Sequence, residues 1–161
     1  AAKQKKVNHR NHKETPEKKN HKTTKQVIHM QNPITIAIDF DGTIVEHKYP
    51  KIGKELPFAI HSLKTLQKKG HRLILWTYRA GEELAEAVEF CAQQGLEFYA
   101  VNKNYPEEKF SDNISRKILA DIYIDDRNLG GMPDWTEIYQ TIHPEEAFTN
   151  KTKPSKKRWW K

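Results

Sequence analysis

Four short apolar runs alternate along the chain with segments whose apolar residues recur at helical spacing. The first run, Ile34–Phe40, alternates in polarity and is rich in β-branched residues, which is typical of a strand. Three further strand-like runs, HRLILWT, LEFYAVN and ADIYIDD, span residues 71–77, 96–102 and 120–126. Strands separated by helices favour a mostly parallel sheet with right-handed crossovers, so this order predicts an α/β, three-layer Rossmann-like fold.

Three helices are expected between and after these strands. The first begins near Pro57 and is indicated by apolar residues at helical spacing, which are Leu56, Ala59, Ile60, Leu63 and Leu66. The second carries a similar stripe that includes Cys91, and it ends at Gly95. The third spans Pro133–Ile142. Residues 104–117 are ambiguous and are compatible with a further short helix.

Basic charge is confined to the two ends of the chain. Residues 1–29 carry a net charge of +7 and residues 151–161 a net charge of +6, whereas residues 30–150 carry −6. We therefore expect three parts, which are a basic disordered tail (1–30), one domain (31–146) and a second basic tail (147–161). Basic tails can bind nucleic acid weakly through its phosphates, although a solvated tail explains the same composition.

The remaining composition limits the classes of protein to which the chain can belong. With Cys91 as the single cysteine, a disulfide framework or a multi-thiol metal site is excluded, and its place on an apolar stripe assigns it to the core. No apolar run approaches the roughly 20 residues of a membrane span, and no apolar signal-peptide core is present at the start. We therefore expect a cytoplasmic protein with no membrane partner.

Polar side chains follow each predicted strand in turn, and they are Asp39 and Asp41, Thr77, Asn102, and Asp125 with Asp126. Ligands of open α/β sheets bind beyond the carboxyl ends of the strands. Residues two apart in a strand point to the same side, so Asp39 and Asp41 are expected to face one cleft and to repel each other. A divalent cation relieves this repulsion, and Mg²⁺ needs only a few carboxylates besides water and a substrate phosphate.

These motifs resemble those of the haloacid dehalogenase (HAD) superfamily of phosphohydrolases. That family has a strand followed by DxDGT, a Thr or Ser ending the next strand, a Lys, and an acidic pair after an apolar strand. The matching residues are Asp39-Phe40-Asp41-Gly42-Thr43, Thr77, Lys117 and Asp125-Asp126. The four motifs occur in the family's order, and the resemblance covers about residues 34–142.

The resemblance implies a magnesium-dependent phosphatase that hydrolyses a phosphate monoester of unknown identity through an aspartyl-phosphate. In this scheme Asp39 is the nucleophile. Asp41 protonates the leaving oxygen, later activates water, and binds Mg²⁺ through its backbone carbonyl. Thr77 donates a hydrogen bond to a phosphoryl oxygen, and Gly42 and Thr43 are expected at the substrate. Phosphoryl transfer needs mainly positioning and charge stabilisation, which this set supplies.

Three assignments stay open at this point. Lys117 is the best match for the lysine that neutralises the phosphoryl group, and Lys103, after the third strand, is its rival. Asp126 is favoured as the direct metal ligand by analogy with capless relatives, with Asp125 behind it. Arg79 can clamp a substrate phosphate with two hydrogen bonds, or it can pair with an acid of the second helix.

The chain leaves no room for a cap domain. About 12 residues separate Thr43 from Glu55 and about 18 separate Asn102 from Ala120, and neither gap can hold a domain. The resemblance therefore implies a capless enzyme whose open site accepts a bulky substrate or is covered by another subunit of a homo-oligomer. Two other functions fit the sequence: a nucleic-acid end phosphatase that uses the basic tails, and a non-catalytic module that binds a phosphoryl ligand.

Overall fold

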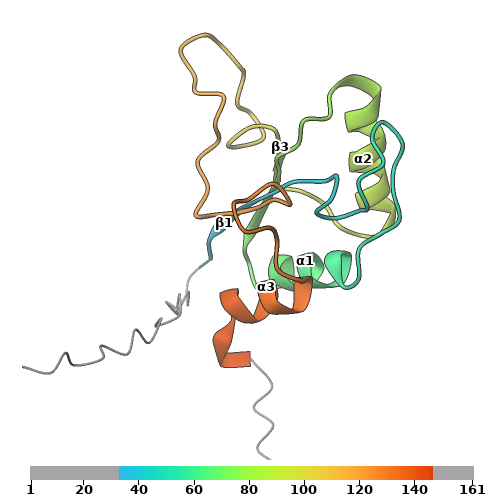
Figure 1. Ribbon diagram of the computed structural model, residues 1–161. Helices are drawn as coiled ribbons and strands as arrows, with labels where there is room; N and C mark the ends of the chain where they lie inside the picture. The colour runs from blue at the N-terminus through green and yellow to red at the C-terminus, as the bar shows by residue number, and fades with distance from the viewer. Residues whose placement is uncertain (1–32, 147–161) are drawn as a thin grey trace, which may run out of the picture.

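The computed structural model of the protein describes residues 33–146, and the four predicted strands form one parallel sheet (Figure 1). The spatial order is β3-β2-β1-β4, with β1 (Thr35–Ile38), β2 (Arg72–Leu75), β3 (Ala100–Val101) and β4 (Ile122–Ile124). In this register Ile36 is paired with Leu73 on one side and with Ile122 on the other. The predicted α/β, Rossmann-like fold is confirmed, whereas both basic tails lie outside the described residues.

Three helices cover one face of the sheet, and they are α1 (Ala59–Lys68), α2 (Gly81–Gln93) and α3 (Trp135–Ile142), with a 3-10 turn, η1 (Pro144–Glu146), after α3. Side chains of this face, including Ile36 and Ile38, form one core with apolar residues of all three helices, such as Leu63, Cys91 and Trp135. Cys91 is therefore a core residue, as predicted. Within residues 33–146, no helix has the length and apolar character that crossing a membrane requires.

The start of α1 differs from the prediction. Pro57, expected in the first turn of this helix, precedes it. Phe58 adopts a left-handed backbone conformation with φ of 64°, so the helix begins only at Ala59.

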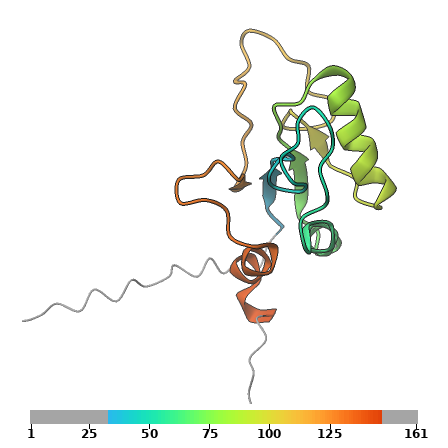
Figure 2. The ribbon, with the colours of Figure 1, turned by 45° about the vertical axis from the view of Figure 1, so that its right-hand side comes forward.

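The second face of the sheet is covered by irregular chain. Ala37, Ile74 and Ala100 point to this face and form a smaller cluster with Ile118. Residues 102–121, all of which are described, contain turns and bends only, so the helix considered over 104–117 is not formed. This stretch is rich in Asn, Ser and Asp, which compete for backbone hydrogen bonds and favour turns. Figures 1 and 2 show it in yellow to orange, extending away from the helices as a long loop.

A pair of buried histidines joins the amino ends of the strands to the end of α3. The Ile34 amide donates to His71 Nδ1 at 3.2 Å, and His71 Nε2 lies 2.9 Å from His143 Nε2. His143 Nδ1 in turn lies 2.7 Å from a carboxylate oxygen of Glu145. With one proton between the two Nε2 atoms, all of these hydrogen bonds can form while both rings are neutral. A second proton between the two Nε2 atoms would have no acceptor. Burial, followed by the neighbouring His143, lowers the pKa of His71.

We expect this pair to make the fold sensitive to mild acid. The pKa of His71 in the folded state lies below its unfolded value of 6.5. The contribution of neutral His71 to the free energy of unfolding is therefore complete above pH 6.5, and it is lost as the pH falls through the folded pKa. The loss can reach about 1.4 kcal/mol per pH unit for one proton. His71→Gln should be less stable at pH 7.5 but should lose less stability by pH 5, measured by urea unfolding. The difference between the two curves isolates His71, since other titrating groups contribute to both, and parallel curves would contradict the prediction.

Candidate functional site

The carboxyl ends of the strands open into a cleft of about 960 Å³. Its lining includes one polar residue after each strand, namely Asp39, Thr77, Asn102 and Asp125. The loop between β1 and α1 and the segment 102–121 form further walls. The edge of the sheet chosen from the sequence is therefore the edge that holds the cleft.

Three carboxylates gather at one point of this edge. Asp39, Asp125 and Asp126 each place an oxygen within 4.8 Å of the other two, in a partly buried position. Asp126 Oδ1 is buried and accepts no hydrogen bond from any residue of the described chain. A buried oxygen without a donor is costly in a protein and suits a cation ligand. Oxygen ligands alone favour a hard cation, so this cluster can hold one.

The cluster is held together by Thr43. Its hydroxyl donates to Asp39 Oδ2 at 3.3 Å and accepts from the Asp126 amide at 3.0 Å, so it joins the ends of β1 and β4. The Thr43 carbonyl accepts from the Trp135 indole at 2.8 Å, which fixes the turn against α3. Thr43 is fully buried and positions the carboxylates, and its expected contact with the substrate stays a prediction.

Gly42 is also needed by the cluster. Its φ of +86° is rarely adopted by other residues, and a Cβ there would lie 2.3 Å from Asp126 Oδ2. The Asp126 carboxylate thus packs directly against the backbone of the first motif. Like Thr43, Gly42 shapes the carboxylate cluster, and its expected place at the substrate stays a prediction.

Asp39 carries an unfavourable charge in this surrounding. Burial raises its pKa to about 6, a backbone hydrogen bond at Phe40 opposes the shift, and the carboxylates of Asp125 and Asp126 raise it further. The physical cause is the removal of a carboxylate from water beside other negative charges. A bound cation would remove this repulsion.

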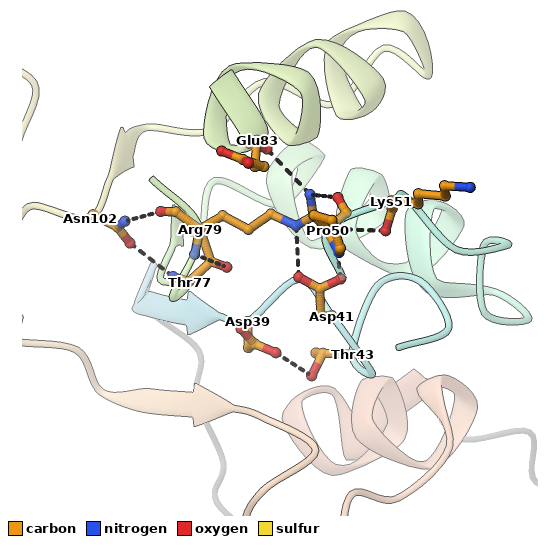
Figure 3. Close-up of polar contacts among 9 residues, drawn as sticks. All are labelled: Asp39, Asp41, Thr43, Pro50, Lys51, Thr77, Arg79, Glu83 and Asn102. Atoms are coloured by element: carbon orange, nitrogen blue, oxygen red, sulfur yellow. Dashed lines mark hydrogen bonds and ion pairs between the residues drawn. The ribbon is translucent and has the colours of Figure 1, made fainter. Parts of the chain in front are cut away.

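Asp41 does not join the cluster, although it stands two residues from Asp39. Its carboxylate points away from Asp39 and is held by Arg79 (Figure 3). Arg79 Nε donates to Asp41 Oδ2 at 2.7 Å and Nη2 donates to Oδ1 at 2.8 Å. β1 ends at Ile38, so the two-residue strand period no longer applies. The expectation that both carboxylates share a cation is therefore corrected, because an arginine neutralises the second one.

Arg79 is buried, with 1% of its surface exposed. Beyond Asp41, it donates to three backbone carbonyls, which are those of Pro50 at 2.8 Å, Lys51 at 3.0 Å and Glu83 at 3.4 Å. These bonds occupy all five N–H groups of the guanidinium. Arg79 has no donor left for a substrate phosphate, and its partner is Asp41 rather than a helix acid, so both readings from the sequence were wrong. The hydrogen bonds to Asp41 raise the pKa of Arg79 and keep it charged.

Thr77 lies in the cleft as predicted, and Asn102 supports it. The Thr77 amide donates to Asn102 Oδ1 at 2.8 Å, and the Thr77 hydroxyl accepts from the Arg79 amide at 3.3 Å. Asn102 itself has a left-handed φ of 52°, which Asn tolerates better than most residues. From the sequence, Asn102 was expected only as a polar residue at the end of a strand. That position does not predict its hydrogen bond to the Thr77 amide.

The structure does not bring Lys117 to the cleft. Its ammonium lies 5.5 Å from the ring centroid of Tyr123, and its neighbours Arg116 and Ile118 line the cleft instead. The chain around Lys117 consists of bends and irregular structure, so local turns rather than a strand period decide which of its side chains face the cleft. Lys103, the rival, is among the lining residues.

Comparison with solved structures shows similarity to a conserved protein from Bacteroides thetaiotaomicron. The two chains are 60% identical, the TM-score is 0.67, and the match covers 73% of this chain and 95% of that one. No family model and no curated protein matches the chain.

Proposed function

The chain belongs to the same family as the conserved Bacteroides thetaiotaomicron protein, and we propose from the residues of its cleft that it is a magnesium-dependent phosphatase of the HAD type. It hydrolyses a phosphate monoester through an aspartyl-phosphate on Asp39. The observation that carries this proposal is the group of three carboxylates, Asp39, Asp125 and Asp126, at one end of an open cleft whose walls include Thr77 and Lys103.

The carboxylate cluster fits Mg²⁺ by its chemistry. Asp39, Asp125 and Asp126 supply oxygen ligands only, and the buried Asp126 Oδ1 lacks a donor among residues 33–146. When bound, Mg²⁺ supplies positive charge to the phosphoryl oxygens. The backbone carbonyl of Asp41 is a further ligand in the resemblance and stays a prediction.

The chain's own groups account for the bond changes. An Asp39 carboxylate oxygen attacks phosphorus, the bond from phosphorus to the leaving oxygen breaks, and the phosphoryl group is transferred to Asp39. The Thr77 hydroxyl donates to a phosphoryl oxygen, and the Lys103 ammonium balances the charge. Water then attacks the phosphorus of the intermediate, the bond from phosphorus to Asp39 breaks, and Asp41 takes the proton of the water, which releases phosphate and restores the Asp39 carboxylate.

Asp41 supplies the proton for the leaving oxygen, as the resemblance implies, which requires that Asp41 is protonated before the attack, whereas the free protein holds it as a carboxylate paired with Arg79. Asp41 lines the cleft, and Arg79 fixes the direction of its carboxyl group. Once the proton has left, the two Arg79 N–H bonds stabilise the resulting carboxylate. Arg79 therefore acts on the reaction through Asp41 and is a positioning residue.

We expect hydrolysis of small phosphate esters to require Mg²⁺. Phosphate release should be measured on a panel of monoesters with Mg²⁺, with excess chelator, and after Mg²⁺ is added back to the chelated protein. Turnover should disappear with chelator and return with Mg²⁺. Full activity in excess chelator would exclude the metal mechanism. A protein that binds phosphate esters with Mg²⁺ but turns none over would be the non-catalytic binding module.

A further inference from the structure

The cleft is larger than the reacting groups require. Ligand sites of about 300–1,000 Å³ accommodate molecules of drug size, and this one, at about 960 Å³, lies near the upper end. A phosphoryl group and a cation beside Asp39 fill a small part of that space. The residues that line the rest of the cleft therefore indicate which chemical group the phosphate is attached to.

Two tyrosine rings stand in the lining beside Thr77. Tyr78 is 93% exposed and Tyr49 is 46% exposed, and the rings meet edge to face with centroids 6.5 Å apart. The buried Arg79 guanidinium lies 5.3 Å from the Tyr49 ring centroid, which holds that ring in place from the protein side. An aromatic surface that is held open to solvent next to a phosphate site suits stacking on a planar ring.

Cationic side chains line the same cleft. Lys103 follows β3, Arg116 belongs to the segment 102–121, and Arg127 follows the acidic pair. Arg116 lies 4.8 Å from the ring centroid of Phe110, another exposed lining residue. Within residues 33–146 neither arginine forms an ion pair. One lysine and a cation suffice for the reacting phosphoryl group, so these arginines indicate a second anionic group on the ligand.

On the basis of the phosphatase activity proposed above, we propose that the substrate is a nucleotide that carries a second phosphate group besides the one removed. The base stacks on the exposed ring of Tyr78, which Tyr49 meets edge to face, and the second phosphate meets Arg116 and Arg127. A free nucleoside bisphosphate and the phosphorylated end of a short oligonucleotide share this chemistry. Sugar phosphates offer no planar ring, and aryl phosphates offer no second anion, so each uses only part of the cleft.

Four kinds of ester separate these features in one assay of kcat/KM with Mg²⁺. The probes are ribose 5-phosphate, p-nitrophenyl phosphate, adenosine 3′,5′-bisphosphate, and deoxythymidine hexamers phosphorylated at the 3′ or the 5′ end. We expect a ring and a second phosphate each to raise kcat/KM, so that ribose 5-phosphate is the poorest substrate. Preference for the hexamer over the bisphosphate identifies a strand end, and the reverse identifies a free nucleotide.

Replacement of the exposed ring supplies the matched test. Tyr78→Ala should lower kcat/KM for the nucleotide probes about 5- to 150-fold relative to ribose 5-phosphate, mainly through KM, because one base–aromatic stack is lost. Tyr78→Phe keeps the stack and should stay close to the wild type. Tyr99→Ala, at the amino end of β3 and away from the cleft, is the control for removal of a partly exposed tyrosine. Arg116→Gln should lower kcat/KM for the bisphosphate more than for p-nitrophenyl phosphate.

Failure of this inference and failure of the phosphatase proposal give different results. If ribose 5-phosphate is hydrolysed as efficiently as the nucleotides, or if Tyr78→Ala slows all probes alike, the substrate class is wrong while the phosphatase stands. If no ester is hydrolysed, the phosphatase fails, and the ligand class is decided by calorimetric binding of adenosine 3′,5′-bisphosphate with Mg²⁺. Binding that Tyr78→Ala weakens and Tyr78→Phe retains supports the class, and absence of binding at millimolar concentration overturns it.

Discussion

Asp39→Asn is expected to abolish turnover and, at the same time, to stabilise the metal-free protein above pH 6. The amide lacks the anionic oxygen that attacks phosphorus, so kcat should fall at least about a thousandfold. Burial raises the pKa of Asp39 from 3.8 to about 6, so the folded state binds this proton more tightly than the unfolded chain does. The ionised carboxylate therefore reduces stability once the pH has risen through 6, and Asn removes that charge.

The size and pH window of this gain follow from the same shift. A pKa change from 3.8 to about 6 corresponds to at most about 3 kcal/mol at pH 7.5, and partial exposure to solvent reduces it. We expect a gain of about 1–2 kcal/mol, which is several degrees in Tm for a domain of this size. The gain should shrink below pH 6 and disappear near pH 4, where Asp39 is protonated in both states. Thermal unfolding in chelator at several pH values measures it.

Asp112→Asn is the matched control, because Asp112 is exposed in the segment 102–121 and does not line the cleft. It should change neither turnover nor Tm. Near-normal turnover in Asp39→Asn would remove Asp39 from the role of nucleophile. Equal stability of wild type and Asp39→Asn at pH 7.5 would show that the carboxylate cluster holds its charges without strain.

The arrangement of Asp39, Thr77 and Asp125 around one cleft was predictable from the sequence. It needed only the order of the strands and the fact that parallel strands end at the same edge of a sheet. Neither the strand order nor the shared edge depends on the orientation of a side chain. For the same reason the burial of Cys91 could be predicted, since its helical stripe faces the sheet whatever the details of packing.

The contacts that the sequence did not predict are made by residues in irregular backbone. Arg79 meets Asp41 because the chain turns after β1 and a loop places the carbonyls of Pro50 and Lys51 beside the same guanidinium. No periodic pattern specifies such a meeting. Lys117 was misplaced for a related reason, because the orientation of a side chain in a long loop follows from local turns that composition does not determine.

Removal of the Arg79 guanidinium should have the largest effect on stability. Asp41 is 8% exposed, so Arg79→Met leaves a buried carboxylate without its partner and should lower the free energy of unfolding by about 3–5 kcal/mol. Tm should fall by more than about 10 °C. Turnover should fall by at least tenfold in kcat in the fraction that stays folded, because the group that protonates the leaving oxygen loses its fixed direction. Arg79→Lys keeps the charge but has three donors in place of five, so it should recover part of the stability.

A double-mutant cycle assigns the loss to the ion pair. In Asp41→Asn/Arg79→Met the buried site carries no unpaired charge, so this protein should be more stable than Arg79→Met alone, yet inactive. Arg72→Met is the control, since Arg72 is exposed on β2 and its guanidinium contacts the Tyr99 ring, so it should change stability by at most about 1 kcal/mol. Equal instability of the single and double variants would show that packing of the guanidinium on Phe40 and Tyr49 matters more than its charge. Wild-type kcat in folded Arg79→Met would contradict the proposed dependence of Asp41 on Arg79.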